Sequence, residues 1–112
     1  MKDKDLIRLQ HMLDYARETI LFASGREKSD LFHDRALMHI LIRLVEVIGE
    51  AAANISQETK DKLPQIEWKL MINMRNRLVH VYHNINLTVL WDTVDQDIPD
   101  LVEKLEKIPG LR

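Results

Sequence analysis

The chain carries an arginine, a histidine and a tyrosine close together, at Arg75, His80 and Tyr82. Arginine keeps its positive charge at physiological pH, whereas histidine gains or loses a proton near neutrality. A fixed cation beside such a titrating group can cleave a phosphodiester without a metal, because one offsets charge and the other moves the proton. The tyrosine adds a hydroxyl that another protein could modify. These residues are therefore the first candidates for a functional site.

The reaction that suits this pair is attack of a ribose 2′-hydroxyl on its own adjacent phosphate. His80 would remove or supply the proton, and Arg75 would hold the phosphate oxygens in its planar fork. Asn76 could orient the phosphate or the histidine. Because DNA lacks the attacking hydroxyl, the chemistry would be restricted to RNA. We expect a 2′,3′-cyclic phosphate product, formed with no metal and no cofactor.

Each of these residues also fits an ordinary structural role when it is taken singly. Arg75 suits a surface ion pair, His80 suits a helix end where the dipole favours a cation, and Tyr82 suits half-buried packing. His83 lies three residues after His80, but no carboxylate stands at matching helical spacing, so the two do not predict a metal site. Spacing alone leaves the catalytic and the structural interpretation open.

The positions around a helix add a geometric condition. Residues advance by about 100° each, so Arg75 and His80 lie about 140° apart on one straight helix. Their side chains would diverge. Either the helix unwinds near His80, or the site combines residues from two chains. We therefore expect a symmetric dimer that brings these faces together.

Composition favours one soluble helical domain over residues 1–112. The chain is 46% hydrophobic and 30% charged, contains no cysteine and carries a net charge of −2. The charge argues against a protein that coats nucleic acid, although a local basic cleft would suffice for RNA. No signal segment or membrane span is expected. The lack of cysteine is compatible with the reducing cytoplasm, which is the expected location.

Apolar residues at steps of three and four predict helices along most of the chain. A first helix is expected from about Lys4 to Ser24, and a second, capped by Ser29 or Asp30, to about Ile55. Their expected apolar faces are Leu6, Leu9, Leu13, Ala16 and Ile20, and then Ala36, Ile40, Leu44, Val47, Ile48, Ala51 and Ile55. A polar stripe on the second helix should be solvated and laced with ion pairs: Arg35, His39, Arg43, Glu46 and Glu50. Gly49 predicts close approach of another helix, since glycine costs about 1 kcal/mol there relative to alanine.

The second half of the chain should hold two more helices, after a turn over residues 56–64. The third is expected from Ile66 or Glu67 to about Tyr82, with its core side at Leu70, Met71, Met74, Leu78 and Val81. Asn86 can cap the fourth, Pro99 should kink or divide it, and Pro109-Gly110 should end it. Trp68 and Trp91 are expected in the core or an interface. The fold class is an all-α antiparallel bundle of four or five helices.

The run from Trp68 to Tyr82, WKLMINMRNRLVHVY, resembles the signature of the HEPN ribonucleases, and most of all the HepT toxin branch. That signature is an arginine, four residues, a histidine, any residue and a tyrosine. The flanking blocks agree: Gly49-Glu50-Ala51-Ala52, Val89-Leu90-Trp91 and Asp97-Ile98-Pro99-Asp100-Leu101. The likeness extends from about Asp5 to Ile108. It departs from the pattern at Asn73, where relatives often have glycine, and at Asn86, where aspartate is common.

The resemblance implies a homodimeric HEPN-like bundle with its active cleft at the dimer interface. It implies a metal-independent endoribonuclease, with Arg75 and His80 as the catalytic pair and Asn76 as a supporting polar residue. It further implies a toxin–antitoxin pair, whose nucleotidyltransferase antitoxin attaches AMP to Tyr82. Added phosphate would bring negative charge and bulk beside Arg75 and His80 and block RNA entry.

Two other interpretations compete with the endoribonuclease toxin. The net negative charge and an expected large helical interface also suit a non-catalytic partner subunit of a nucleotidyltransferase. Plain oligomeric scaffolding would account for the bundle but leaves the polar cluster of the third helix without a purpose. Cleavage of RNA in a chelator, and its dependence on Arg75 and His80, separates these hypotheses.

Overall fold

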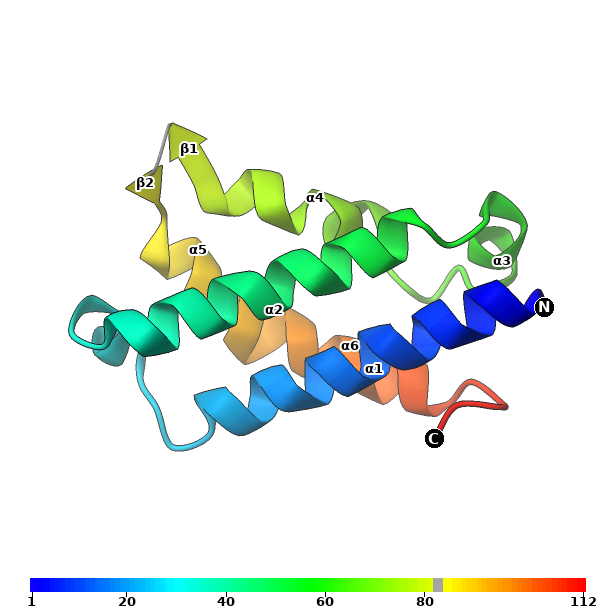
Figure 1. Ribbon diagram of the computed structural model, residues 1–112, viewed down its shortest axis with the longest axis horizontal. Helices are drawn as coiled ribbons and strands as arrows, with labels where there is room; N and C mark the ends of the chain where they lie inside the picture. Colours follow the sequence, from blue (N-terminus) through cyan, green and yellow to red (C-terminus); the bar gives the residue numbers. More distant parts are fainter. Residues whose placement is uncertain (82–83) are drawn as a thin grey trace.

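Two long helices, α1 (Asp3–Ala23) and α2 (Arg35–Ala53), lie side by side in the computed structural model (Figure 1). The C-terminal helix α6 (Ile98–Glu106) packs against α1, and α4 (Trp68–Leu78) packs against α2. The molecule measures 43 × 29 × 19 Å along its principal axes. The structure describes residues 1–81 and 84–112, with the backbone alone at 75, 78–81, 84 and 85.

Short elements connect these four helices. A 3₁₀ helix, η1 (Lys28–Phe32), leads into α2, and α3 (Gln57–Lys62) follows it. Strands β1 (Val79–Val81) and β2 (Asn84–Ile85) form a two-stranded antiparallel ribbon after α4. Helix α5 (Leu87–Asp92) and a π-helical turn, η2 (Thr93–Asp97), then lead into α6. Within residues 1–81 and 84–112, no helix combines the length and the apolar character needed to cross a membrane.

The prediction that the chain is mainly helical is confirmed, whereas the ribbon of β1 and β2 was not predicted. The predicted face of α1 reaches the core at Leu9, Leu13 and Ala16. The predicted stripe of α2 is partly wrong, since Ala36 and Ile40 are exposed and neighbouring positions are buried instead. Those buried positions are Leu37, Leu41, Val45 and Ala52, beside the correctly predicted Leu44 and Ile48. Helix α2 is apolar around more than one stripe, so packing against α1 and α4 selects its buried side.

The start of α2 also differs from the prediction. Ser29 and Asp30 lie within η1, where the Asp30 carboxylate accepts a hydrogen bond from the backbone N–H of Glu27 at 2.8 Å. Asp34 caps α2 instead, by accepting from the N–H of Leu37 at 3.0 Å. Asp30 is therefore already engaged in capping the preceding turn, and the next aspartate takes the role at α2.

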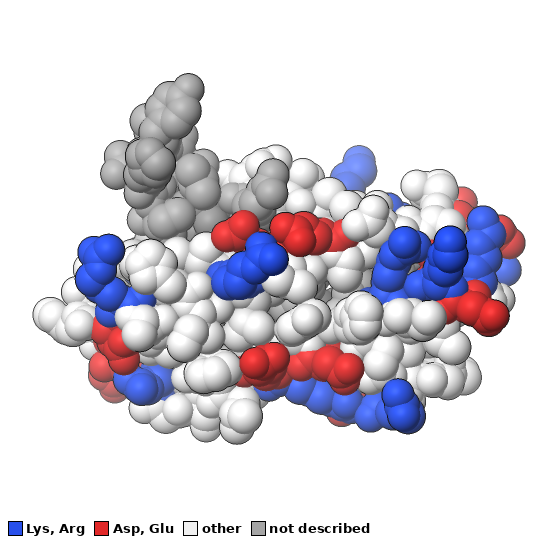
Figure 2. Space-filling model, in the orientation of Figure 1, with Lys and Arg blue, Asp and Glu red and all other residues white. Residues whose placement is uncertain are grey.

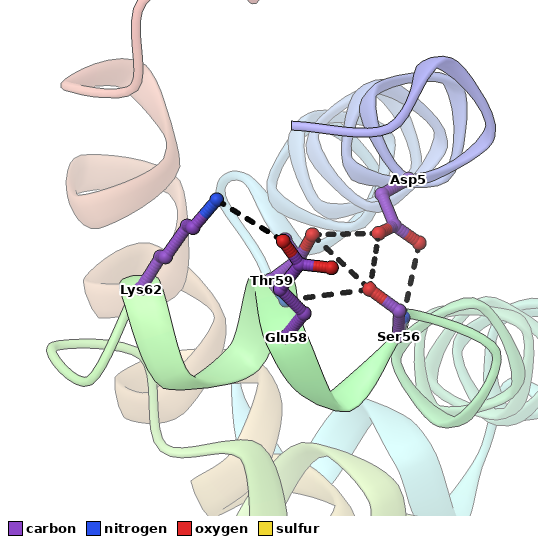
Figure 3. A network of polar contacts seen from close by, with 5 residues as sticks. All are labelled: Asp5, Ser56, Glu58, Thr59 and Lys62. Atoms are coloured by element: carbon purple, nitrogen blue, oxygen red, sulfur yellow. Dashed lines mark hydrogen bonds and ion pairs between the residues drawn. The ribbon is translucent and has the colours of Figure 1, made fainter.

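The segment predicted as a turn over residues 56–64 contains α3, which is joined to α1 by a buried carboxylate (Figure 3). Asp5 is 2% exposed and accepts hydrogen bonds from the Ser56 N–H at 3.0 Å, the Ser56 Oγ at 2.5 Å and the Thr59 Oγ1 at 2.6 Å. Burial by itself would raise the pKa of Asp5, but these hydrogen bonds outweigh it and lower the pKa from 3.8 to about 2. Asp5 therefore holds the first turns of α1 and α3 together as an anion.

The predicted fourth helix is divided, as Pro99 required. Asn86 caps α5 by accepting from the N–H of Val89 at 3.0 Å, which confirms the predicted cap. In η2 the N–H of Ile98 donates to the carbonyl of Thr93, five residues back, and Pro99 follows in the first turn of α6. Proline has no N–H and its ring crowds the carbonyl four residues earlier, so a widened turn precedes it.

Candidate functional site at the end of α4

Helix α4 is anchored at its first residue and along one side. The indole Nε1 of Trp68 donates to the carbonyl of Leu63 at 3.0 Å, and the ring packs half-buried against the core. Met71 and Met74 are buried, as predicted, and Leu70 is half-buried. These contacts fix the orientation of α4 as it approaches the motif residues.

The predicted C-terminal bound of this helix is wrong. Helix α4 ends at Leu78 instead of Tyr82, and the backbone of His80 belongs to β1. The pairing of Val79 with Ile85 and of Val81 with Asn84 holds this backbone extended, with an irregular register between the two pairs. The β-branched side chain of valine favours such extended backbone. Helical geometry left two alternatives, a helix that unwinds near His80 or a site that combines residues from two chains. The helix does end before His80.

Arg75 and His80 are thus placed on different elements, with Arg75 in α4 and His80 in β1. The side chains of both residues lie outside the described part of the structure, so their convergence stays a prediction. Tyr82 and His83 also lie outside them. Among the predicted site residues, the structure describes the side chain of Asn76, which is exposed.

Asn76 lines a groove between α2 and α4 with a volume of about 240 Å³. The other lining residues are Glu46, Gly49, Glu50, Ala53, Ile72 and Asn73. Asn73 is one of the two positions where the sequence departs from the HepT pattern, and this departure falls in the wall of the groove. Asn76, which follows Arg75 in the sequence, therefore lies at a groove in the surface.

Gly49 brings the two helices of the groove together, as predicted. A Cβ atom at Gly49 would lie 2.9 Å from the backbone carbonyl oxygen of Met71. Real Cβ atoms do not approach backbone oxygens that closely, so a larger residue would push α4 away from α2. Gly49 therefore sets the width of the groove that Asn76 lines.

Glu46 and Glu50 also line this groove, a position that was not predicted for them. Both belong to the predicted polar stripe of α2, and Glu50 does form an ion pair of the expected kind, with its Oε1 3.6 Å from Arg43 Nη1. Two carboxylates and two amides suit hydrogen-bond donors and cations, whereas a phosphate would be repelled. Gly49, which lies between Glu46 and Glu50 in the sequence, could have predicted this position. Residues on either side of a glycine at a close helix contact also lie near that contact. Because of these two carboxylates, the described lining of this groove does not favour a phosphate.

The last turn of α4 is also tied to the C-terminal part of the chain. Arg77 Nη1 lies 3.5 Å from Asp97 Oδ2, and the two side chains are 41% and 27% exposed. Burial raises the pKa of Asp97, while the positive charge of Arg77 opposes this rise. This pair was not predicted, since its members lie 20 positions apart in the sequence.

Charges on the face shown in Figure 2 are mixed, with blue and red side chains interspersed over the helices. This agrees with the net charge of −2. On this face, the described residues present no broad basic field for coating a nucleic acid. RNA attraction would therefore have to come from a few local cations, and such attraction weakens as salt rises.

Comparisons with known proteins bear on what this site is. Residues 12–108 match the family described as ribonuclease HepT-like. A Thermococcus cleftensis protein named "Probable ribonuclease HepT" is 42% identical over 79 residues, which cover 70% of this chain and 72% of the relative. Two proteins whose names carry a provisional RNase assignment, from Methanocaldococcus jannaschii and Caldanaerobacter subterraneus, are each 31% identical over 100 residues. These alignments cover 89% of this chain, and 83% and 89% of the respective relatives. The comparison with solved structures gave no significant match. The chain belongs to the HepT-like ribonuclease family.

Proposed function

We propose that this chain is the toxin of a toxin–antitoxin pair and that it cleaves RNA internally without a metal. A ribose 2′-hydroxyl attacks the adjacent phosphate, His80 moves the proton and Arg75 stabilises the charge that builds on the phosphate oxygens. The observation that carries the proposal is an intact arginine–histidine–tyrosine motif, Arg75, His80 and Tyr82, in a chain of the HepT-like ribonuclease family.

The end of α4 at Leu78 supports this chemistry. On one uninterrupted helix, Arg75 and His80 would be turned about 140° apart. An extended strand after the helix removes that restriction on the direction of His80. In the proposal, two copies of the chain associate at this end of α4 and form the cleft together, with Asn76 as a supporting polar residue.

Neutralisation is proposed to act on Tyr82. A nucleotidyltransferase antitoxin would transfer AMP to its hydroxyl, with the oxygen attacking the α-phosphate of ATP and pyrophosphate leaving. The added negative charge would lie close to the phosphate-binding arginine in sequence and would oppose RNA binding. Intact mass spectrometry after incubation with the antitoxin and ATP should show AMP increments on the wild type. The Tyr82→Phe variant should show none.

The cleavage test compares the wild type with Arg75→Ala and His80→Ala on RNA in the presence of a chelator. Removing a general acid or base should lower the rate by about 100-fold or more. Arg35→Ala and His39→Ala are matched controls, since both residues are exposed on α2, and they should retain the rate. Equal cleavage by all five proteins would remove the motif from the mechanism. A wild type that binds a nucleotidyltransferase but cleaves nothing would support the non-catalytic partner instead.

A further inference from the structure

A second arginine of the motif, Arg77, has a described partner. It lies one residue before the end of α4, and its guanidinium contacts Asp97 at 3.5 Å. Successive helical residues point about 100° apart, so Arg77 can turn toward Asp97 while Asn76 lines the groove beside α2. Arg77 therefore ties the last turn of α4 to the junction between η2 and α6.

The π-helical turn places Asp97 at this junction. Leu90, Val94 and Ile98 follow one another at steps of four residues, and all three are buried. Such spacing keeps side chains on one side of a helix, and the widened turn, in which the N–H of Ile98 donates to the carbonyl of Thr93, continues that buried side into α6. Ile98 stays in the core, and Asp97 beside it keeps its carboxylate near α4. Turns of this kind are rare and recur at functional sites.

The surroundings of Asp97 disfavour its negative charge. Burial raises the pKa of Asp97, Glu67 and Asp100 add negative charge nearby, and Arg77 is the cation that acts against them. Both members of the pair are partly exposed, so it adds little to global stability. Its effect is expected to be local, on the direction in which the chain leaves α4 toward β1 and His80.

We propose that Arg77 and Asp97 are positioning residues for RNA cleavage: their ion pair fixes the end of α4 and thereby the path of the strand that carries His80. The inference rests on the proposed function, and it assigns neither residue a contact with the reacting atoms. A small displacement of a reacting group lowers the rate of the chemical step more than the affinity for substrate.

The kinetic test uses Asp97→Asn, which keeps the shape and removes the charge. We expect kcat on RNA to fall about tenfold with KM within about twofold. The matched control is Glu106→Gln, because Glu106 also pairs with an arginine of another helix, Arg17 on α1, at 2.9 Å. That variant should keep both constants. An unchanged kcat in Asp97→Asn, or an equal fall in the control, would overturn the proposal.

A second variant, Arg77→Met, removes the positively charged member of the ion pair. It should reproduce the fall in kcat, and the double variant should fall no further, since one interaction is removed either way. If Arg77 instead contacts RNA directly, Arg77→Met raises KM while Asp97→Asn leaves kcat unchanged. Additive losses would also overturn the positioning role.

Amide hydrogen exchange tests the pair without relying on cleavage. Asp97→Asn should raise exchange about fivefold or more in the last turn of α4 and in β1, whereas Glu106→Gln should leave both segments unchanged. Equal exchange in both variants and the wild type would sink the proposal even if RNA is cleaved. A wild type that cleaves no RNA would instead refute the proposed function, and the exchange result would still decide whether the pair holds this segment.

Discussion

At the scale of single residues, a close approach of α2 and α4 at the groove depends on the absence of one side chain. Gly49 lies on α2, and a Cβ there would meet the carbonyl oxygen of Met71 on α4 at 2.9 Å. An alanine would gain about 1 kcal/mol in helix propensity. The same methyl group would force α2 and α4 apart, and overpacking of this kind costs about 1–3 kcal/mol. The atom that the added methyl group would meet belongs to the backbone, which cannot move aside as a flexible side chain would. The steric cost should therefore exceed the gain in helix propensity.

Gly49→Ala should therefore destabilise the protein by about 1 kcal/mol net and should lower RNA cleavage, because the groove beside Asn76 would widen. Chemical denaturation gives the first quantity and the cleavage rate at a temperature well below unfolding gives the second. His39→Ala is the matched control, as an exposed alanine substitution on the same helix. A Gly49→Ala variant more stable than the wild type would contradict the close-contact argument.

At the scale of elements, α1 and α3 are joined through Asp5. Its carboxylate accepts three hydrogen bonds from Ser56 and Thr59, which lower its pKa to about 2. Because the pKa of Asp5 is lower in the folded than in the unfolded protein, the Asp5 carboxylate contributes fully to the free energy of unfolding above about pH 4. This contribution is lost as pH falls through about 2, where the folded protein must also protonate the group.

Asp5→Asn should accordingly lose about 2 kcal/mol of unfolding free energy at pH 7. Its stability should also fall less steeply than that of the wild type between pH 4 and pH 2. Denaturant titrations at several pH values measure both effects. Asp14→Asn serves as the control, because Asp14 is an exposed residue of α1 whose carboxylate accepts from Gln10. Parallel pH profiles for the wild type and Asp5→Asn would rule out this role of the carboxylate.

At the scale of the whole molecule, the proposed cleft needs two copies of the chain. The net charge of −2 and the mixed charges in Figure 2 provide no general attraction for RNA. A shared cleft would double the number of local cations that face one phosphate. Symmetric pairing of identical chains places the same residues opposite one another, which is how such a cleft would be assembled.

Mixing inactive subunits tests whether the site is shared. If Arg75 of one subunit works with His80 of the other, a heterodimer of Arg75→Ala and His80→Ala chains holds one intact site. Random re-association of equal amounts should then recover about a quarter of the wild-type activity. Each variant alone should stay inactive after the same unfolding and refolding. No recovery from a mixture shown by mass to contain heterodimers would place both groups in one subunit.

Features that depend on local chemistry could be predicted from the residues and their spacing alone. Residue periodicity was enough for the buried side of α1, since that helix has one dominant apolar face. Asn86 was recognisable as a cap because its side chain reaches a backbone N–H three residues away. Gly49 predicted a close helix contact because few other needs justify glycine inside a helix. The motif of Arg75, His80 and Tyr82 was readable for the same reason, as a matter of residue type and spacing.

Features that depend on partners distant in the sequence could not be predicted before the fold was known. Helix α4 ends at Leu78 because β1 pairs with β2, and residues on the same helix carry no signal of that pairing. The buried side of α2 was chosen by the helices on either side of it. Asp97, at the end of a π-helical turn, pairs with Arg77, which lies 20 positions earlier in the sequence. Local propensities are short-ranged, whereas packing and long-range hydrogen bonding choose among the conformations that those propensities allow.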